Sequence, residues 1–255
     1  MCRAVVFFDL DGTLLTSDDQ ILPSSVSAIH ELQNRQVDPV ICTGRNIKEI
    51  QSIIEITGID TLITENGSYI KHHQTIRIEN IRKRVVKELV EKANELGDAV
   101  GFRNAIRVAV TKINRYTRSC YGGYFKWAKV DPYYYLKHPV NFLNVFTDGN
   151  DVDDYRKSFR GKLDITQNDP HVLDINRAGV SKATGIQDVL DDFHLTGLPT
   201  YAFGDGYNDI PMFEEVDHSI AMANADAQCK HFASYVTDSN DNNGIVNALK
   251  HYRLI

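Results

Sequence analysis

The chain has 255 residues, which is long enough for one large domain or two moderate ones with a substantial buried core. Its formal net charge of −6 argues against nucleic-acid binding by the chain as a whole, and no apolar stretch reaches the roughly 18 residues that a membrane-spanning helix needs. The four cysteines show no CxxC spacing and no signal peptide precedes the first strand, so we expect a soluble cytoplasmic protein without disulfides.

The first 80 residues alternate between strand and helix patterns. The apolar run Ala4–Phe8 is typical of a strand buried on both faces. Pro39 has no amide hydrogen, which argues against the early part of the second strand being a fully paired central segment, so we expect its regular portion to begin near Val40. Strands separated by helices indicate βαβ units and a parallel sheet. The predicted elements are strands at 4–8, 37–43 and 61–64, helices around 23–33 and 47–54, and a hairpin of 69–71 with 75–78.

The pattern changes after residue 80 and returns near residue 178. A long amphipathic helix around Val85 is followed by strands and one further helix in mixed order, which is typical of an α+β domain. We therefore predict an α/β fold with two parts. Residues 1–80 and 178–255 form a Rossmann-like parallel-sheet core with helices on both faces, and residues 81–177 form an inserted α+β cap domain.

Two compositional features of the inserted segment have alternative explanations. Ten Lys or Arg stand against four Asp or Glu from Arg82 to Arg118, which is either a solvated helix face with exposed loops or a surface that attracts an anion. Aromatic residues are dense at 120–127 and 133–136. They serve either a core or interface of the inserted domain, or a lid that stacks on a ligand.

Four segments place polar residues where a regular element begins or ends. In open parallel sheets, ligands bind at the carboxyl ends of the strands. Asp9 and Asp11 follow the first strand two positions apart, so both carboxylates can face one ligand. The other segments are Thr43-Gly44-Arg45 after the second strand, Lys182 near a helix start, and Gly204-Asp205-Gly206-Tyr207-Asn208-Asp209 after a later strand.

The charges of these segments favour a bound divalent cation. Four carboxylates, those of Asp9, Asp11, Asp205 and Asp209, stand against the single ammonium group of Lys182. Two like charges at 4 Å repel each other by about 4 kcal/mol at an effective dielectric constant of about 20. All candidate ligands are oxygens, with no well-placed His or Cys, so the set favours Mg²⁺ over zinc.

In order and spacing, these segments resemble the four motifs of the haloacid dehalogenase superfamily of phosphohydrolases. The resemblance rests on Asp9-Leu-Asp-Gly-Thr, Thr43-Gly-Arg, Lys182 and Gly204-Asp-Gly-Tyr-Asn-Asp. The segments Ile63–Gly67, Gly179–Lys182 and Asp241–Ile245 are similar to the Cof-type sugar-phosphatase branch of that superfamily. The motifs cover the core from end to end, whereas the inserted segment matches only in length and placement.

The resemblance implies a role for each matching residue. Asp9 is the expected nucleophile, which forms an aspartyl-phosphate, and Asp11 is the expected general acid and base. Three alternatives stay open: Thr43 and Asp209 as helix caps, and Arg45 as a partner of the inserted domain. The implied Mg²⁺ ligands are Asp9, Asp205 and the main-chain carbonyl of Asp11, the implied phosphate-binding residues are Thr43, Gly44, Arg45, Lys182 and Asn208, and Asp209 is implied to orient Lys182 or metal-bound water.

The function implied by the resemblance is Mg²⁺-dependent hydrolysis of phosphomonoesters. The expected substrates are small phosphorylated metabolites, with sugar phosphates first among them. A sugar-phosphate mutase on the same scaffold and a non-catalytic protein that binds a phosphorylated metabolite are the alternatives. We expect neither a nucleic acid nor a membrane as a partner, and a monomer or weak homo-oligomer.

Overall fold

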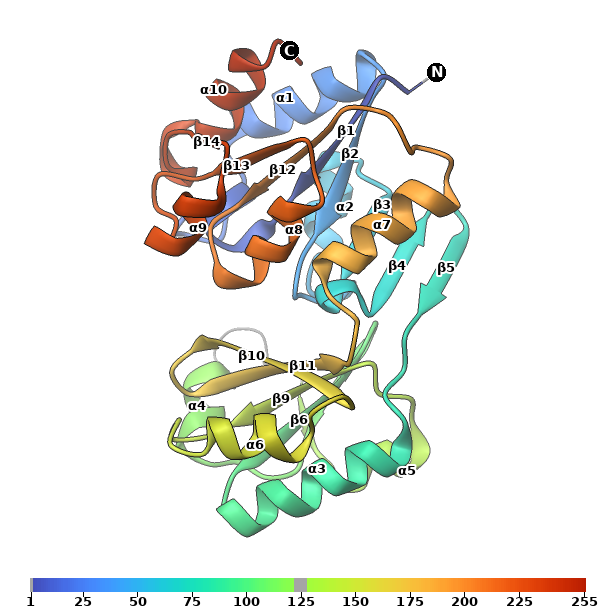
Figure 1. Ribbon diagram of the computed structural model, residues 1–255, viewed down its shortest axis with the longest axis vertical. Helices are drawn as coiled ribbons and strands as arrows, with labels where there is room; N and C mark the ends of the chain where they lie inside the picture. Colours follow the sequence, from blue (N-terminus) through green and yellow to red (C-terminus); the bar gives the residue numbers. More distant parts are fainter. Residues whose placement is uncertain (1, 122–127) are drawn as a thin grey trace. The chain divides into compact units, whose positions relative to one another are not determined.

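The computed structural model describes residues 2–121 and 128–255, and the chain divides into two compact units (Figure 1). The first unit comprises Met1–Gly44, Ile50–Arg77 and Ser181–Ile255, and the second comprises Arg45–Glu49 and Ile78–Val180. The predicted inserted domain, 81–177, differs from this division by three residues at each end (78 against 81, and 180 against 177) and omits 45–49.

The first unit is built on an eight-stranded sheet with the strand order β14-β13-β12-β1-β2-β3-β4-β5. The six strands from β14 to β3 are parallel, and β4 runs antiparallel to β3. The predicted parallel-sheet core is therefore confirmed. The strands are β1 (Ala4–Phe8), β2 (Val37–Cys42), β3 (Thr61–Thr64), β4 (Tyr69–His72), β5 (Thr75–Ile78), β12 (Thr200–Gly204), β13 (His218–Ala221) and β14 (Tyr235–Val236).

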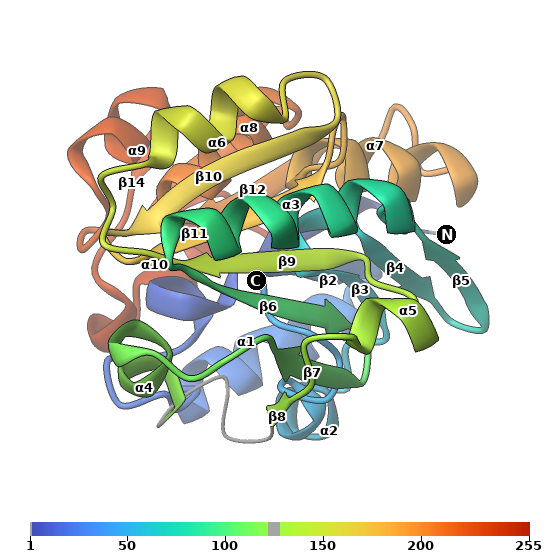
Figure 2. The same cartoon turned by 90° about the horizontal axis from the view of Figure 1, so that it is seen from below.

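Helices cover both faces of this sheet, as predicted (Figure 2). On one face, α7, α8 and α9 pack on a core in which Phe7, Val40 and Ile186 are fully buried. Within the part of the chain that the structure describes, no helix has the length and apolar character needed to cross a membrane. The helices are α1 (Pro23–Asn34), α2 (Gln51–Thr57), α7 (Lys182–Asp192), α8 (Ile210–Glu214), α9 (Ala227–Phe232) and α10 (Gly244–His251).

The expectation that the early part of β2 would not be a fully paired central segment is confirmed, although the strand itself starts before Val40. The strand begins at Val37, and Pro39 is paired in register with Val6 of β1. The pairing of β2 with its other neighbour, β3, starts only at Val40. Pro39 thus lies where β2 has one neighbour, so the missing N–H leaves no ladder partner unsatisfied on the other side.

The second unit is a six-stranded sheet with helices α3 and α6 on one face (Figure 1). The core of this unit lies between the sheet and the two helices. Val86 and Leu89 of α3 and Tyr155 of α6 pack there on buried residues of the strands. In the aromatic segment predicted at 120–127, residues 122–127 lie outside the described residues. The elements are α3 (Lys83–Leu96), β6 (Ala99–Asn104), β7 (Arg107–Val110), α4 (Arg115–Tyr121), β8 (Lys129–Val130), α5 (Tyr134–Lys137), β9 (Phe142–Phe146), α6 (Val152–Ser158), β10 (Leu163–Asp169) and β11 (Val172–Arg177).

Residues 45–49 do not continue the helix that the isoleucine spacing predicts from residue 47, because α2 begins only at Gln51. Asn46 and Glu49 close a local turn: the Asn46 N–H donates to Oε2 of Glu49 at 2.8 Å, and the Glu49 N–H donates to Oδ1 of Asn46 at 3.1 Å. The Glu49 carboxylate also forms a buried ion pair with Arg103 of β6. This ion pair fixes the segment within the second unit.

Candidate active site

Asp9 and Asp11 lie at the carboxyl end of β1. The Asp9 N–H donates to the carbonyl of Phe203 in β12 at 3.0 Å. The chain then passes through Leu10–Leu14, which we call the Asp11 turn, where Asp11 (φ −70°, ψ 120°) and Gly12 (φ 74°, ψ −2°) are not helical. A Cβ atom added at Gly12 would lie 2.3 Å from Oδ2 of Asp205. Both the left-handed backbone and this close approach require glycine here.

Lys182 is a buried lysine held between two carboxylates. Helix α7 begins at this residue because Ser181 and Thr184 form a capping box: the Thr184 N–H donates to Oγ of Ser181, and the Ser181 N–H donates to Oγ1 of Thr184. Lys182 is only 1% exposed. Its Nζ donates to Oδ1 of Asp9 at 2.5 Å and to Oδ1 of Asp209 at 2.7 Å. These two ion pairs explain how a lysine, a residue that is rarely buried unless paired, is accommodated here.

The loop after β12 is organised around Asp209. Its Oδ2 accepts the main-chain N–H groups of Asp205 at 2.9 Å and Gly206 at 3.0 Å, while its Oδ1 pairs with Lys182. The side chain makes no capping hydrogen bond to α8. Asp209 therefore connects the loop to the lysine, and the alternative of a side-chain cap for α8 is not observed.

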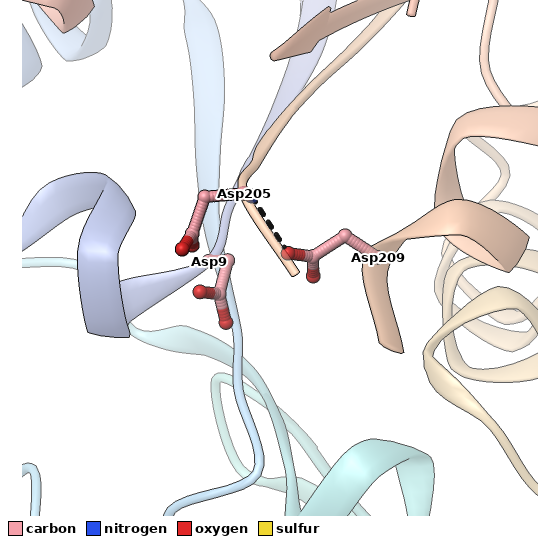
Figure 3. Close-up of side chains that lie close together, drawn as sticks. All are labelled: Asp9, Asp205 and Asp209. Carbon is pink, nitrogen blue, oxygen red and sulfur yellow. Dashed lines mark hydrogen bonds between the residues drawn. The ribbon is translucent and has the colours of Figure 1, made fainter. Parts of the chain in front are cut away.

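Three carboxylates from distant parts of the chain lie together at this edge of the sheet. Asp9, Asp205 and Asp209 each contribute an oxygen to a group whose members all lie within 4.8 Å of one another. Figure 3 shows Asp9 and Asp205 side by side at the ends of neighbouring strands, with Asp209 reaching in from the turn before α8. The hydroxyl of Thr13 also donates to Oδ1 of Asp205 at 2.8 Å.

Burial and mutual repulsion raise the pKa values of Asp9 and Asp205. Burial is the main cause of the raised pKa of Asp9, and the charges of Asp209, Asp205 and Asp11 add to it against the opposing effect of Lys182. Burial and the charge of Asp209 raise the pKa of Asp205 to about 7. For Lys182, burial alone would lower the pKa, but the charges of Asp209 and Asp9 outweigh it and keep the group protonated.

The donor set fits a hard divalent cation. One lysine neutralises only part of three clustered carboxylates, and a cation would relieve the remaining repulsion. All the donors are oxygens, as Mg²⁺ prefers. Asp9 and Asp205 belong to this group, whereas the carboxylate of Asp11 does not, and the expected contribution of Asp11 was its main-chain carbonyl.

A second set of predicted residues meets at Asn66, in the turn after β3. The Asn66 N–H donates to the carbonyl of Thr43 at 3.0 Å, and the Asn208 side-chain amide donates to Oδ1 of Asn66 at 3.4 Å. A Cβ atom added at Gly44 would lie 3.2 Å from the same Oδ1. Asn66 thus connects the loop after β2 with the loop after β12. Arg45, by contrast, is grouped with the second unit.

Comparison with known proteins identifies the family. A sequence profile described as haloacid dehalogenase-like hydrolase matches residues 6–249. The chain belongs to this family. The predicted resemblance to the haloacid dehalogenase superfamily, and with it the prediction of an enzyme of the phosphatase class, is confirmed.

Relatives of this haloacid dehalogenase-like hydrolase match it over nearly its whole length. The 5-amino-6-(5-phospho-D-ribitylamino)uracil phosphatase YcsE of Bacillus subtilis strain 168 is 27% identical over 98% of this chain and 96% of its own length. Two solved structures each have a TM-score of 0.89: BT1666 of Bacteroides thetaiotaomicron, at 27% identity (100% of this chain, 96% of the other), and the subclass IIB sugar phosphatase BT4131, at 25% identity (99% and 100%).

Two residues of the hydrolase site, Thr13 and Asn66, were assigned no role from the sequence. Thr13 is the last residue of the first motif, and its position beside Asp11 was the available signal. Asn66-Gly67 has the form of an ordinary turn signal, which concealed its contact with Asn208. Asn66 also has φ of +51°, a conformation that asparagine tolerates better than most residues. The roles of the predicted residues in catalysis stay predictions.

Proposed function

We propose that this hydrolase cleaves phosphomonoesters with Mg²⁺ through an aspartyl-phosphate on Asp9. The observation that carries the proposal is the buried contact of Asp9 with Lys182, beside Asp205 and Asp209. This arrangement fixes a carboxylate at a strand end and surrounds it with groups that attract a phosphoryl group and a cation. Phosphoryl transfer depends mainly on such positioning and electrostatic stabilisation.

The proposed reaction has two steps. An oxygen of Asp9 forms a bond to phosphorus while the ester P–O bond breaks, and Asp11 gives its proton to the departing oxygen. A water molecule then attacks phosphorus and gives a proton to Asp11, which releases inorganic phosphate and restores Asp9. Lys182 holds Asp9 and, with Thr43 and the residues around it, binds the phosphoryl oxygens.

Mg²⁺ would be held by the carboxylates of Asp9 and Asp205 and by the carbonyl of Asp11. When bound, it would neutralise the acidic group and draw negative charge from the phosphoryl group. Lys182 performs part of that neutralisation through its contact of 2.5 Å with Oδ1 of Asp9.

Release of inorganic phosphate from p-nitrophenyl phosphate tests this proposal. We expect turnover with Mg²⁺, none after chelation with EDTA, and recovery when Mg²⁺ is added back. Asp9→Asn should lose essentially all turnover and keep the circular dichroism spectrum and melting temperature of a folded protein. Near-normal activity in that variant would refute the assignment, and transfer of phosphate to a second hydroxyl in place of its release would indicate a mutase.

We also propose a small phosphorylated metabolite, most plainly a sugar phosphate, as the substrate. Support comes from the names of two relatives, the phosphoribitylaminouracil phosphatase YcsE and the sugar phosphatase BT4131. The second unit contains a pocket of about 570 Å³ lined in part by Arg107, Lys129 and Tyr134. A screen of phosphate release from roughly a hundred metabolites tests the substrate class. The double variant Arg107→Ser, Lys129→Ser should change the order of preference while sparing p-nitrophenyl phosphate.

We expect this enzyme to act in the cytoplasm as a monomer or weak homo-oligomer, without nucleic acid or membrane partners. The net charge of −6 supports the first of these exclusions. Sedimentation velocity at several concentrations tests the oligomeric state. A stable oligomer at micromolar concentration would contradict the expectation.

A further inference from the structure

The Asp11 turn is held by a side chain from a distant part of the chain. Nδ2 of Asn224, in the segment between β13 and α9, donates to the main-chain carbonyl of Gly12 at 2.7 Å. Gly12 directly follows Asp11 and has a left-handed backbone, so its carbonyl direction is coupled to the position of the Asp11 main chain. Asn224 itself is exposed, so its side chain is not part of the apolar core.

A second asparagine extends this contact to the far end of the turn. Oδ1 of Asn224 accepts the N–H of Asn240 at 3.1 Å, and Nδ2 of Asn240 donates to the carbonyl of Leu15 at 2.9 Å. Gly12 and Leu15 are three residues apart, so the two asparagines hold both sides of the segment that follows Asp11. We call this pair the asparagine clamp.

The clamp is joined to the acidic group as well. The Asp226 N–H, two residues beyond Asn224, donates to the carbonyl of Asp205 at 3.0 Å, and the Met222 N–H donates to the carbonyl of Gly204 at 3.1 Å. The segment that carries Asn224 is therefore bonded to the end of β12. Through it, the Asp11 turn and the Asp205 loop share one hydrogen-bonded frame.

We propose that Asn224 and Asn240 are positioning residues that hold the Asp11 carboxyl where it protonates the leaving oxygen of the substrate. The inference rests on the proposed function, in which Asp11 gives its proton to the ester oxygen while the P–O bond breaks. An alkyl alcohol is a poor leaving group and needs that proton, whereas p-nitrophenolate leaves readily without it. Loss of the clamp therefore slows the cleavage of alkyl phosphates selectively.

The test compares an alkyl and an aryl phosphate in Asn224→Ala. The value of kcat/KM for glycerol 2-phosphate should fall about ten-fold, a fraction of the 10²–10⁴-fold that general acid catalysis typically contributes. The value for p-nitrophenyl phosphate should stay within about two-fold, because its departure needs little acid assistance. The value of kcat/KM is the readout because it reports the steps up to formation of the aspartyl-phosphate, so the later hydrolysis of that intermediate, in which Asp11 also takes part, does not enter it.

Asn242→Ala is the matched control. Asn242 is an exposed asparagine two residues from Asn240, and its side chain donates to Oγ of Ser239 at 2.8 Å and not to a carbonyl of the Asp11 turn. Neither ester should be affected by this change. Asn224→Asp is the second variant if Asn224→Ala does not fold, since it keeps the acceptor for Asn240 but loses the donor to Gly12, and it should show the same selective loss.

The two proposals fail in different ways. If the wild type releases no phosphate from either ester in the presence of Mg²⁺, the proposed function is wrong and the clamp proposal is overturned with it. If the wild type cleaves both esters and the Asn224 variants slow both equally, or neither, the proposed function stands and the clamp does not position Asp11.

Discussion

Replacing Lys182 by methionine tests the electrostatic account of the site directly. Methionine keeps an unbranched chain of similar length but removes the charge that pairs with Asp9 and Asp209. Both carboxylates would remain buried, at 6% and 1% exposure, with no lysine between them. We therefore expect the variant to be less stable as well as less active.

The size of the effect follows from the distances. At 2.7 Å and an effective dielectric constant of about 20, one such ion pair attracts by about 6 kcal/mol. The cost of removing the ammonium group from water, several kcal/mol, offsets much of this attraction. Removal of one partner of a buried ion pair typically costs about 3–5 kcal/mol of stability, because the other charge is left buried and unpaired. For a chain of this size, that loss lowers the melting temperature by roughly 6–20 °C.

Thermal unfolding by circular dichroism without metal measures the loss, and turnover should fall by about 10²–10³-fold. The double variant Lys182→Met, Asp209→Asn removes one orphaned charge, so it should be more stable than Lys182→Met alone. Lowering the pH should also reduce the difference in stability between Lys182→Met and the wild type. Burial and neighbouring charges raise the pKa of Asp9, so a fall in pH protonates Asp9 and removes its unpaired charge. If the double variant is no more stable than the single variant throughout the pH range, the reasoning is refuted.

Three further predictions concern the same site and its support. Gly12→Ala should lose at least about 1 kcal/mol of stability and most turnover, because the φ of 74° is strained for alanine and the new methyl group would meet Asp205 at 2.3 Å; melting and kcat/KM check this. Mg²⁺ should raise the melting temperature more at pH 8 than at pH 5. The pKa of Asp205 is raised from its ordinary value of 3.8 to about 7, so the metal-free folded state binds the extra proton and loses stability as the pH rises through this window; an equal or smaller Mg²⁺ effect at pH 8 would contradict this. Arg103→Met should cost about 3 kcal/mol, because it leaves Glu49 buried and unpaired, and the cost should shrink in the double variant with Glu49→Gln, as measured by urea unfolding.

The convergence of the acidic group could be predicted because it follows from sheet topology. Parallel strands end at one edge, and Phe8 of β1 is in register with Phe203 of β12. Residues that directly follow these strands, such as Asp9 and Asp205, therefore come together wherever they stand in the chain. The neighbouring residues of Lys182 in the sequence did not indicate that it is buried. Its assignment to the site depended on the order of the motifs.

Other features could not be predicted because their partners carry no local pattern. The attachment of residues 45–49 to the second unit includes an ion pair between Glu49 and Arg103, which are far apart in the sequence. Asn224 and Asn240 are of a residue type that is common in loops. No pattern in the sequence shows whether a loop asparagine donates to a distant carbonyl or faces water. Pro39 indicated correctly that the early part of β2 is not fully paired, but it could not show that this part already pairs with β1 from Val37.

The single positive charge of Lys182 neutralises only part of the negative charge of Asp9, Asp205 and Asp209. One oxygen of Asp209 accepts the loop N–H groups and the other accepts from Lys182. Thr13 donates to Asp205 and Lys182 donates to Asp9, so each carboxylate accepts at least one hydrogen bond from the protein. Such donors orient the oxygens but do not remove their charge. A site of this kind is rigid before a cation or phosphoryl group arrives, and charge neutralisation is the term left for the ligand to supply. Binding energy then goes into relieving repulsion among groups that are already in place, which is the condition for electrostatic stabilisation without reorganisation.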